Sequence, residues 1–264
     1  MQISAGLHKE WMFFYRNKRL LAVIIFYLVF ALMNPLMARA AVSVGGEAMG
    51  FPDGMNIGEL VTLQKTFVES FSMIFTAAIV TMFLISGAAG GEQKKRSIVM
   101  PQTAGLTAGG YVIPKFMLYP PVVFIMTIAS AFAMNAACHY AFGESFGSEI
   151  VFVTATLYGL YAVFVFCMYM FLGISLGQPK LAVLYMFIAD SLFGIMVSQF
   201  DIVKFTPWNL FDIANETALS GGVADSSALF GTAAVTLVLC VVFLGVTIFA
   251  VKAKRMDNSS DEMY

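Results

Sequence analysis

The chain has 264 residues, of which 59% are hydrophobic and 12% are charged, and its mean hydropathy is +0.83. Soluble globular proteins have about 25% charged residues. A soluble fold of this length would therefore lack polar surface, and a bilayer-embedded domain is expected. The net charge of −1 excludes a large basic surface, so no nucleic-acid partner is expected.

Six apolar segments are each long enough to cross about 30 Å of hydrocarbon. The segments are 20–38, 67–90, 116–138, 150–176, 181–200 and 228–251. They are continuous rather than alternating, which argues against the strands of a β-barrel and leaves helices as the element that satisfies its own backbone in lipid. The sequence predicts an all-α membrane protein in which residues 1–264 form one transmembrane domain.

Lys and Arg are distributed unequally between the two sets of loops. Twelve lie on the side of the two chain ends, and three, Arg39, Lys65 and Lys204, lie on the other side. Because positively charged loops stay in the cytoplasm, both termini are predicted to be cytoplasmic. An even number of spans agrees with this orientation.

Residues 7–19 precede the first apolar segment and are rich in aromatic and basic side chains. Trp11, Phe14 and Tyr15 can share one side of a helix, with Arg16 among the cations available to lipid headgroups. This pattern predicts an interfacial amphipathic helix. The alternative is an ordinary aromatic and basic flank of the first span.

The loop after the second segment is the longest one predicted to be cytoplasmic. Residues 92–100 are predicted to form a short helix that Pro101 ends. Ile98 and Met100 then place apolar side chains at the tip of a charged loop, which indicates a protein partner. A simple positively charged anchor is the alternative.

The predicted outer segment 201–227 mixes acidic residues with Phe205, Trp208 and Phe211. It is too apolar for a free loop and too short and polar to span the bilayer. We expect a short helix or a broken re-entrant segment at the outer interface.

Asp190 is the ionisable residue nearest the middle of a predicted span. An aspartate there costs about 2.5–3.5 kcal/mol on insertion scales, so its side chain should face protein or water. One hypothesis is a contact with substrate or a proton relay. The other is a hydrogen bond between helices, with Ser191 or Asn135 as partner.

Two further patterns concern helix packing. Gly173 and Gly177 form a GxxxG motif near the end of the fourth segment, which predicts a close helix approach. Pro120 and Pro121 are expected in the first turns of the third span, where proline is tolerated.

Motifs for catalysis and for cofactors are not found in the sequence. It contains no G-x-x-x-x-G-K-[ST], no H-E-x-x-H and no G-x-S-x-G. Its three cysteines lie in apolar runs without close spacing, so neither a disulfide nor a zinc site is indicated. The chain is not expected to be an enzyme or to hold a cofactor or metal itself.

Topology and one local motif together resemble the permease subunit of type-2 ABC exporters. That family has six spans, cytoplasmic termini, an amphipathic connecting helix, a coupling helix between spans two and three, and short outer helices before the last span. The local match is Glu92-Gln-Lys-Lys-Arg-Ser-Ile-Val-Met-Pro101-Gln-Thr103, followed by Tyr111-Val-Ile-Pro-Lys115-Phe. Met100 replaces the usual leucine, and Ala104 stands where arginine is common.

The resemblance implies that two ATPase subunits, which hold ATP and Mg, drive this chain together with a second permease chain, identical or different. The connecting helix would also touch the ATPase, through Trp11, Tyr15 and Arg16. The residues assigned to ATPase coupling are Glu92, Gln93, Lys94, Lys95, Arg96, Ser97, Ile98, Met100 and Pro101.

The resemblance also implies a cargo path between the two permeases, along spans two and five. The residues expected to line it are Phe71, Phe75, Asp190 and Phe193. An amphipathic peptide, a toxin or a lipophilic drug would be exported across a bacterial plasma membrane. Two alternatives remain open: an ion- or proton-coupled carrier that uses Asp190, and a membrane scaffold that transports nothing.

Overall fold

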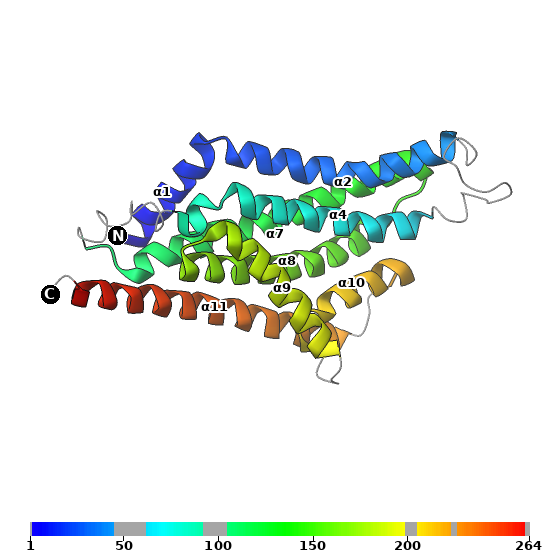
Figure 1. Cartoon of the computed structure of the whole chain (residues 1–264). Helices are drawn as coiled ribbons and strands as arrows, with labels where there is room; N and C mark the ends of the chain where they lie inside the picture. Colours follow the sequence, from blue (N-terminus) through cyan, green and yellow to red (C-terminus); the bar gives the residue numbers. More distant parts are fainter. Residues whose placement is uncertain (1, 45–61, 92–104, 199–204, 223–225, 262–264) are drawn as a thin grey trace.

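The structure is a computed structural model that describes residues 2–44, 62–91, 105–198, 205–222 and 226–261. Within these ranges it consists of helices without strands, and six helices are long and apolar enough to cross a membrane. These are α2 (Arg19–Val44), α4 (Leu63–Leu84), α7 (Ala108–Phe142), α8 (Ser148–Leu176), α9 (Pro179–Ser198) and α11 (Ser226–Asp261). The prediction of an all-α membrane protein is confirmed, and Figure 1 shows both termini at the same end of the bundle.

Helix α8 is the central helix of the bundle. Of the apolar part of α8, 67% of the residues are buried, compared with 22% in α2, 22% in α9 and 17% in α11. It packs against α7, α9, α10 (Asn209–Ser220) and α11. The poorly buried helices at the periphery therefore expose most of their apolar side chains on the outside of the bundle.

The third span begins earlier than predicted, at Ala108 instead of residue 116. Thr107 caps it, because its hydroxyl accepts a hydrogen bond from the Gly110 amide at 3.0 Å. Pro120 and Pro121 consequently lie inside α7, and the prediction that they occupy its first turns is wrong. Each proline lacks an N–H, so a carbonyl one turn earlier loses its helical partner.

The second span is interrupted near the end that also bears the termini. Regular α-helix stops at Leu84, and the chain continues as the π-helical turn η2 (Gly87–Gly91). Tyr169 of α8 donates its hydroxyl to the Met82 carbonyl at 2.7 Å, which fixes the last regular turn of α4 against α8. Such π-helical turns are frequent at functional sites.

The two glycines of the GxxxG motif have different roles. A Cβ on Gly173 would lie 2.4 Å from the Ala89 carbonyl oxygen, so the predicted close approach is confirmed at this glycine, with η2 as the neighbour. Gly177 ends α8 with φ of 66° and donates its N–H to the Gly173 carbonyl at 3.0 Å. This left-handed conformation favours glycine.

The N-terminal segment forms the predicted amphipathic helix, α1 (Gln2–Arg16). Trp11 and Tyr15 are exposed, but Phe14 is buried against the protein. The expectation that all three aromatic rings share one side is therefore wrong. Phe14 is one helical turn from Glu10, and these two residues form the buried face of α1.

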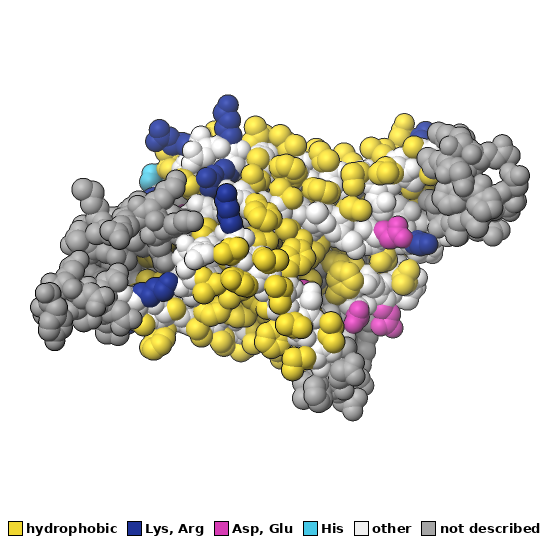
Figure 2. All heavy atoms as spheres, in the orientation of Figure 1, with side chains coloured by type: hydrophobic (Ala, Val, Ile, Leu, Met, Phe, Trp, Pro, Cys, Tyr) yellow, Lys and Arg dark blue, Asp and Glu magenta, His cyan; other side chains and the backbone are white. Residues whose placement is uncertain are grey.

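On the face shown in Figure 2, charged side chains gather toward the two ends of the bundle, and hydrophobic side chains cover most of the surface between them. Among the described side chains, the end with the termini has Lys9, Arg16, Lys18, Arg19, Lys180, Lys252 and Lys254. The opposite end has Arg39 and Lys65 together with Glu69, Glu144, Glu149, Asp212 and Glu216.

Candidate functional site

Asp190 lies on α9, eight residues before the end of that helix at Ser198. Its Oδ2 accepts a hydrogen bond from the Tyr161 hydroxyl at 2.8 Å, and its Oδ1 accepts one from Trp208 Nε1 at 3.0 Å. Tyr161 belongs to α8, and Trp208 directly precedes α10. The partly buried carboxylate thus joins three parts of the chain.

The partners proposed from the sequence for Asp190 are not the observed ones. Ser191 is exposed. The Asn135 side chain is used elsewhere, because it accepts from the Phe146 amide at 3.0 Å and donates to the Phe146 carbonyl at 3.1 Å. The sequence identified the need for a partner, but the facing helices decide which partner it is.

Aromatic rings surround Asp190 and its donors. Phe75 of α4 stacks on Tyr161 with ring centres 5.5 Å apart, and Phe211 of α10 lies 6.1 Å from the same ring. Phe193 of α9, which is 52% exposed, lies 6.1 Å from Trp208. Together these contacts form one aromatic cluster across four helices.

A second layer of rings extends the cluster toward the end of the bundle opposite the termini. Phe71 stacks on Tyr158 with ring centres 4.2 Å apart and an interplanar angle of 5°. Tyr158 also contacts the edge of Phe211 and donates its hydroxyl to Asn215 Oδ1. The four residues predicted to line a cargo path, Phe71, Phe75, Asp190 and Phe193, are thus brought into one cluster.

Helix α10 is the short helix predicted for the segment before the last span. Its buried residues Leu210, Ile213 and Thr217 face the bundle. Trp208 contacts Asp190, which lies eight residues before the end of α9, or about 12 Å at 1.5 Å per residue. Trp208 therefore lies alongside α9 and not beyond its end. Partial burial raises the pKa of the Asp212 carboxyl above its usual range.

The chemistry of the Asp190 cluster is that of a satisfied carboxylate. A tyrosine hydroxyl and an indole N–H both donate to it, and buried polar groups that are paired in this way fix helices relative to one another. Within the described ranges, no group of three or more His, Cys, Asp or Glu side chains that would suit a metal ion is found.

A second polar cluster fastens α1 to α7 near the termini. Lys115 is fully buried, and its Nζ lies 2.6 Å from Glu10 Oε1. Tyr119 donates its hydroxyl to Glu10 Oε2 at 2.9 Å and meets the edge of the Phe14 ring. Lys115 Nζ also lies 4.7 Å from the centre of the Tyr111 ring. We call Glu10, Lys115 and Tyr119 the α1 anchor.

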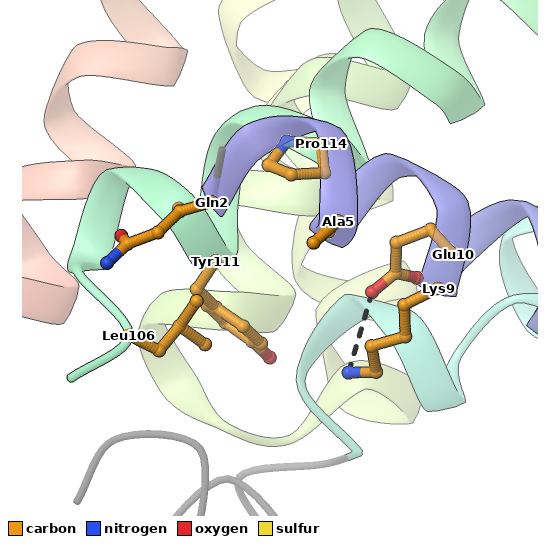
Figure 3. Close-up of a pocket in the computed structure, with 9 residues that line it drawn as sticks. Gln2, Ala5, Lys9, Glu10, Leu106, Tyr111 and Pro114 are labelled. Atoms are coloured by element: carbon orange, nitrogen blue, oxygen red, sulfur yellow. Dashed lines mark ion pairs between the residues drawn. The ribbon is translucent and has the colours of Figure 1, made fainter. Parts of the chain in front are cut away.

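A cavity of about 330 Å³ opens beside the α1 anchor, between α1 and the start of α7 (Figure 3). Gly6 approaches α7 closely, since a Cβ there would lie 2.6 Å from Pro114 Cγ. At the rim, Gln2 accepts from the Thr107 hydroxyl at 2.9 Å and donates to the Gly105 carbonyl at 3.0 Å. These contacts hold α1 against α7 on both sides of the cavity.

The remaining site predictions concern α1 and residues 92–101. Trp11, Tyr15 and Arg16 are exposed on α1, away from the anchor. The nine residues assigned to ATPase coupling, Glu92, Gln93, Lys94, Lys95, Arg96, Ser97, Ile98, Met100 and Pro101, lie outside the described residues.

Sequence reasoning missed the α1 anchor, although a signal for it exists. Lys115 stands in an otherwise apolar helix, and a cation there requires a partner. Glu10 is the first acidic residue of the chain and the only one before Glu47. The missed residues of the other cluster, Tyr161 and Trp208, have no comparable signal, because either ring would also suit an apolar core.

Comparisons of the chain with protein-family models, with curated proteins and with solved structures gave no match. The class of protein therefore follows from the fold itself. The chain is an all-α, multi-pass membrane protein.

Proposed function

We propose that this chain is the transmembrane permease subunit of an ABC exporter, driven by separate ATPase subunits. The observation that supports this function best is the attachment of α1. An amphipathic helix outside the spans is joined to the third span by a fully buried ion pair, Glu10–Lys115. A helix held in this way moves together with α7 when a partner protein pushes on it.

Two connections would transmit such a push into the bundle. The α1 anchor couples α1 to α7. The π-helical turn η2 directly precedes residues 92–101 in the sequence, and Gly173 lets η2 pack closely against the central helix α8. Movement of α4 and α8 would in turn alter the Phe75–Tyr161–Asp190 contacts.

The proposed complex contains two permease chains, alike or different, and two ATPases that bind ATP and Mg. The termini would lie in the cytoplasm of a bacterial cell, because the end of the bundle with the termini bears most of the described cations. The aromatic cluster around Asp190 suits an amphipathic or lipophilic cargo such as a peptide, toxin or drug.

The test is co-purification of the tagged chain in mild detergent after expression with its native genetic neighbourhood. A P-loop ATPase is expected in equal amount with the wild-type chain. Ile98→Pro is expected to lose the ATPase, because proline disrupts the predicted coupling helix. The matched control is Ile57→Pro, the same substitution in the segment that the sequence predicts to be the first outer loop, which should keep the ATPase.

If no ATPase accompanies the wild-type chain and the chain still moves solutes, the exporter proposal is wrong. The carrier hypothesis then applies, since a partly buried carboxylate in a span, Asp190, is the group expected to titrate. In that case Asp190→Asn should abolish transport by a chain that is still inserted in the membrane. If the chain is a scaffold, Asp190→Asn should change its stability, and neither the wild type nor the variant should transport solutes.

A further inference from the structure

Three cations occur within four residues at the corner between α1 and α2. Helix α1 ends at Arg16 and α2 begins at Arg19. Lys18 adopts a left-handed conformation with φ of 54°, and Asn17 donates its side-chain N–H to the Phe13 carbonyl at 2.9 Å. The corner is thus a defined turn, and it exposes Arg16 and Lys18 to the surroundings.

Arg19 is held differently from its two exposed neighbours. Its guanidinium lies over the Phe13 ring, 4.4 Å from the ring centre. It also lies against the start of η2, where a Cβ on Gly87 would be 3.4 Å from Nη1. Nη1 is buried and has no hydrogen-bond partner among the described residues. Arg19 as a whole is partly exposed, so an anion outside the bundle can offset its charge by accepting hydrogen bonds from the other N–H groups of the guanidinium.

The position of the corner identifies the kind of acceptor. Directly after Arg19, α2 exposes Leu21, Ile24 and Ile25. On the other side of the corner, Trp11 and Tyr15 of α1 are exposed. Aromatic rings and cations at the end of an apolar span mark the headgroup level of the membrane. The anions present at that level are lipid phosphates.

We propose that the α1–α2 corner binds the phosphate group of an anionic phospholipid. Arg19 is the direct ligand, since a planar guanidinium binds phosphate oxygens with two parallel hydrogen bonds. Arg16 and Lys18 flank the site and favour a lipid with net negative charge. The acyl chains lie along the exposed apolar side chains of α2. The proposal is independent of the exporter function, because it requires neither ATPase nor cargo.

Native mass spectrometry of the detergent-purified chain tests the site, with phosphatidylglycerol, phosphatidylcholine and inorganic phosphate as probes. The wild-type chain should retain phosphatidylglycerol in preference to phosphatidylcholine. Arg19→Gln should lower this retention about tenfold, which corresponds to about 1.4 kcal/mol. Lys180→Gln is the matched control, an exposed cation at the same end of the bundle, and should retain the lipid fully.

Several results would overturn the proposal. Equal retention by Arg19→Gln and Lys180→Gln would mean that the lipid coats the surface without a site. Binding of inorganic phosphate at Arg19 without lipid retention would identify free phosphate as the ligand. If the wild type retains no lipid and Glu92→Gln lowers the melting temperature as much as Arg19→Gln does, Arg19 pairs with Glu92 of the same chain.

A second variant keeps the test decisive if Arg19→Gln does not fold. Arg19→Lys preserves the charge but loses the planar fork. Its lipid retention should fall between those of the wild type and Arg19→Gln, about threefold below the wild type. Retention by Arg19→Lys equal to that of the wild type would exclude the bidentate contact on which the site depends.

Discussion

Glu10 and Lys115 show how a single buried pair holds an element in place. They are 105 residues apart in sequence, and both side chains are almost completely excluded from solvent. Taking two charges out of water is expensive, so such a pair contributes less to stability than its short distance implies. Removing one partner lowers the stability far more than removing both, because it leaves an isolated charge in the interior.

This asymmetry gives a prediction at the residue scale. Glu10→Gln and Lys115→Met should each lower the free energy of unfolding by about 3–5 kcal/mol. In the double variant, the free energy of unfolding should fall by clearly less than the sum of the two single losses, as measured by unfolding in mixed detergent micelles. Lys9→Met is the control, because Lys9 is 55% exposed and 3.9 Å from Glu10, and it should cost less than about 1 kcal/mol. Additive losses in the double variant would argue against a coupled pair.

The indole of Trp208 reports directly on Asp190. The chain has two tryptophans, so a Trp11→Phe background leaves Trp208 as the only indole. Asp190→Ala in this background should shift the fluorescence emission to shorter wavelength, because the indole loses a charged hydrogen-bond acceptor. Glu149→Gln, which neutralises an exposed acid of α8, should leave the emission unchanged. An unshifted spectrum of Asp190→Ala would contradict the observed hydrogen bond.

At the scale of elements, the contact between α8 and η2 depends on the absence of a side chain at Gly173. A methyl group there would meet the Ala89 carbonyl, and backbone cannot move aside as a flexible side chain can. The π-helical geometry of η2 brings this carbonyl to α8, and the Tyr169 hydroxyl donates a hydrogen bond to the Met82 carbonyl in the last turn of α4. The end of the second span is therefore fixed to the central helix at two points.

Gly173→Ala is accordingly expected to lower the free energy of unfolding by about 1–3 kcal/mol. Gly177→Ala should cost about 1 kcal/mol for a different reason, the positive φ of the helix cap. Gly245→Ala is the matched control, because a Cβ there meets nothing within 4 Å, and it should be neutral or stabilising. Equal melting temperatures of Gly173→Ala and Gly245→Ala would contradict the close approach.

For the whole molecule, the distribution of charge and the number of spans predict which end faces the cytoplasm. The test uses single cysteines in a background without Cys138, Cys167 and Cys240. A membrane-impermeable maleimide should label Ser220→Cys on intact cells and Gln178→Cys only after the membrane is opened, because these exposed positions lie at opposite ends of the bundle. The reverse labelling pattern would invert the proposed orientation.

The sequence by itself determined the number of spans, the helical class, the amphipathic α1 and the short helix before the last span. These follow from local properties: a bilayer requires long apolar runs, and helices satisfy their own backbone within each run. The same reasoning identified Asp190 as a residue that needs a partner, since a charge near the middle of a span is costly unless it is paired or solvated.

Only the tertiary structure decided which side chains meet. Asp190 pairs with Tyr161 and Trp208, which are 29 and 18 residues away, and Phe14 turns toward the protein while Trp11 and Tyr15 do not. The physical reason is that the rotation of each helix about its axis is set by packing against its neighbours, and hydropathy along the chain contains little information about that rotation.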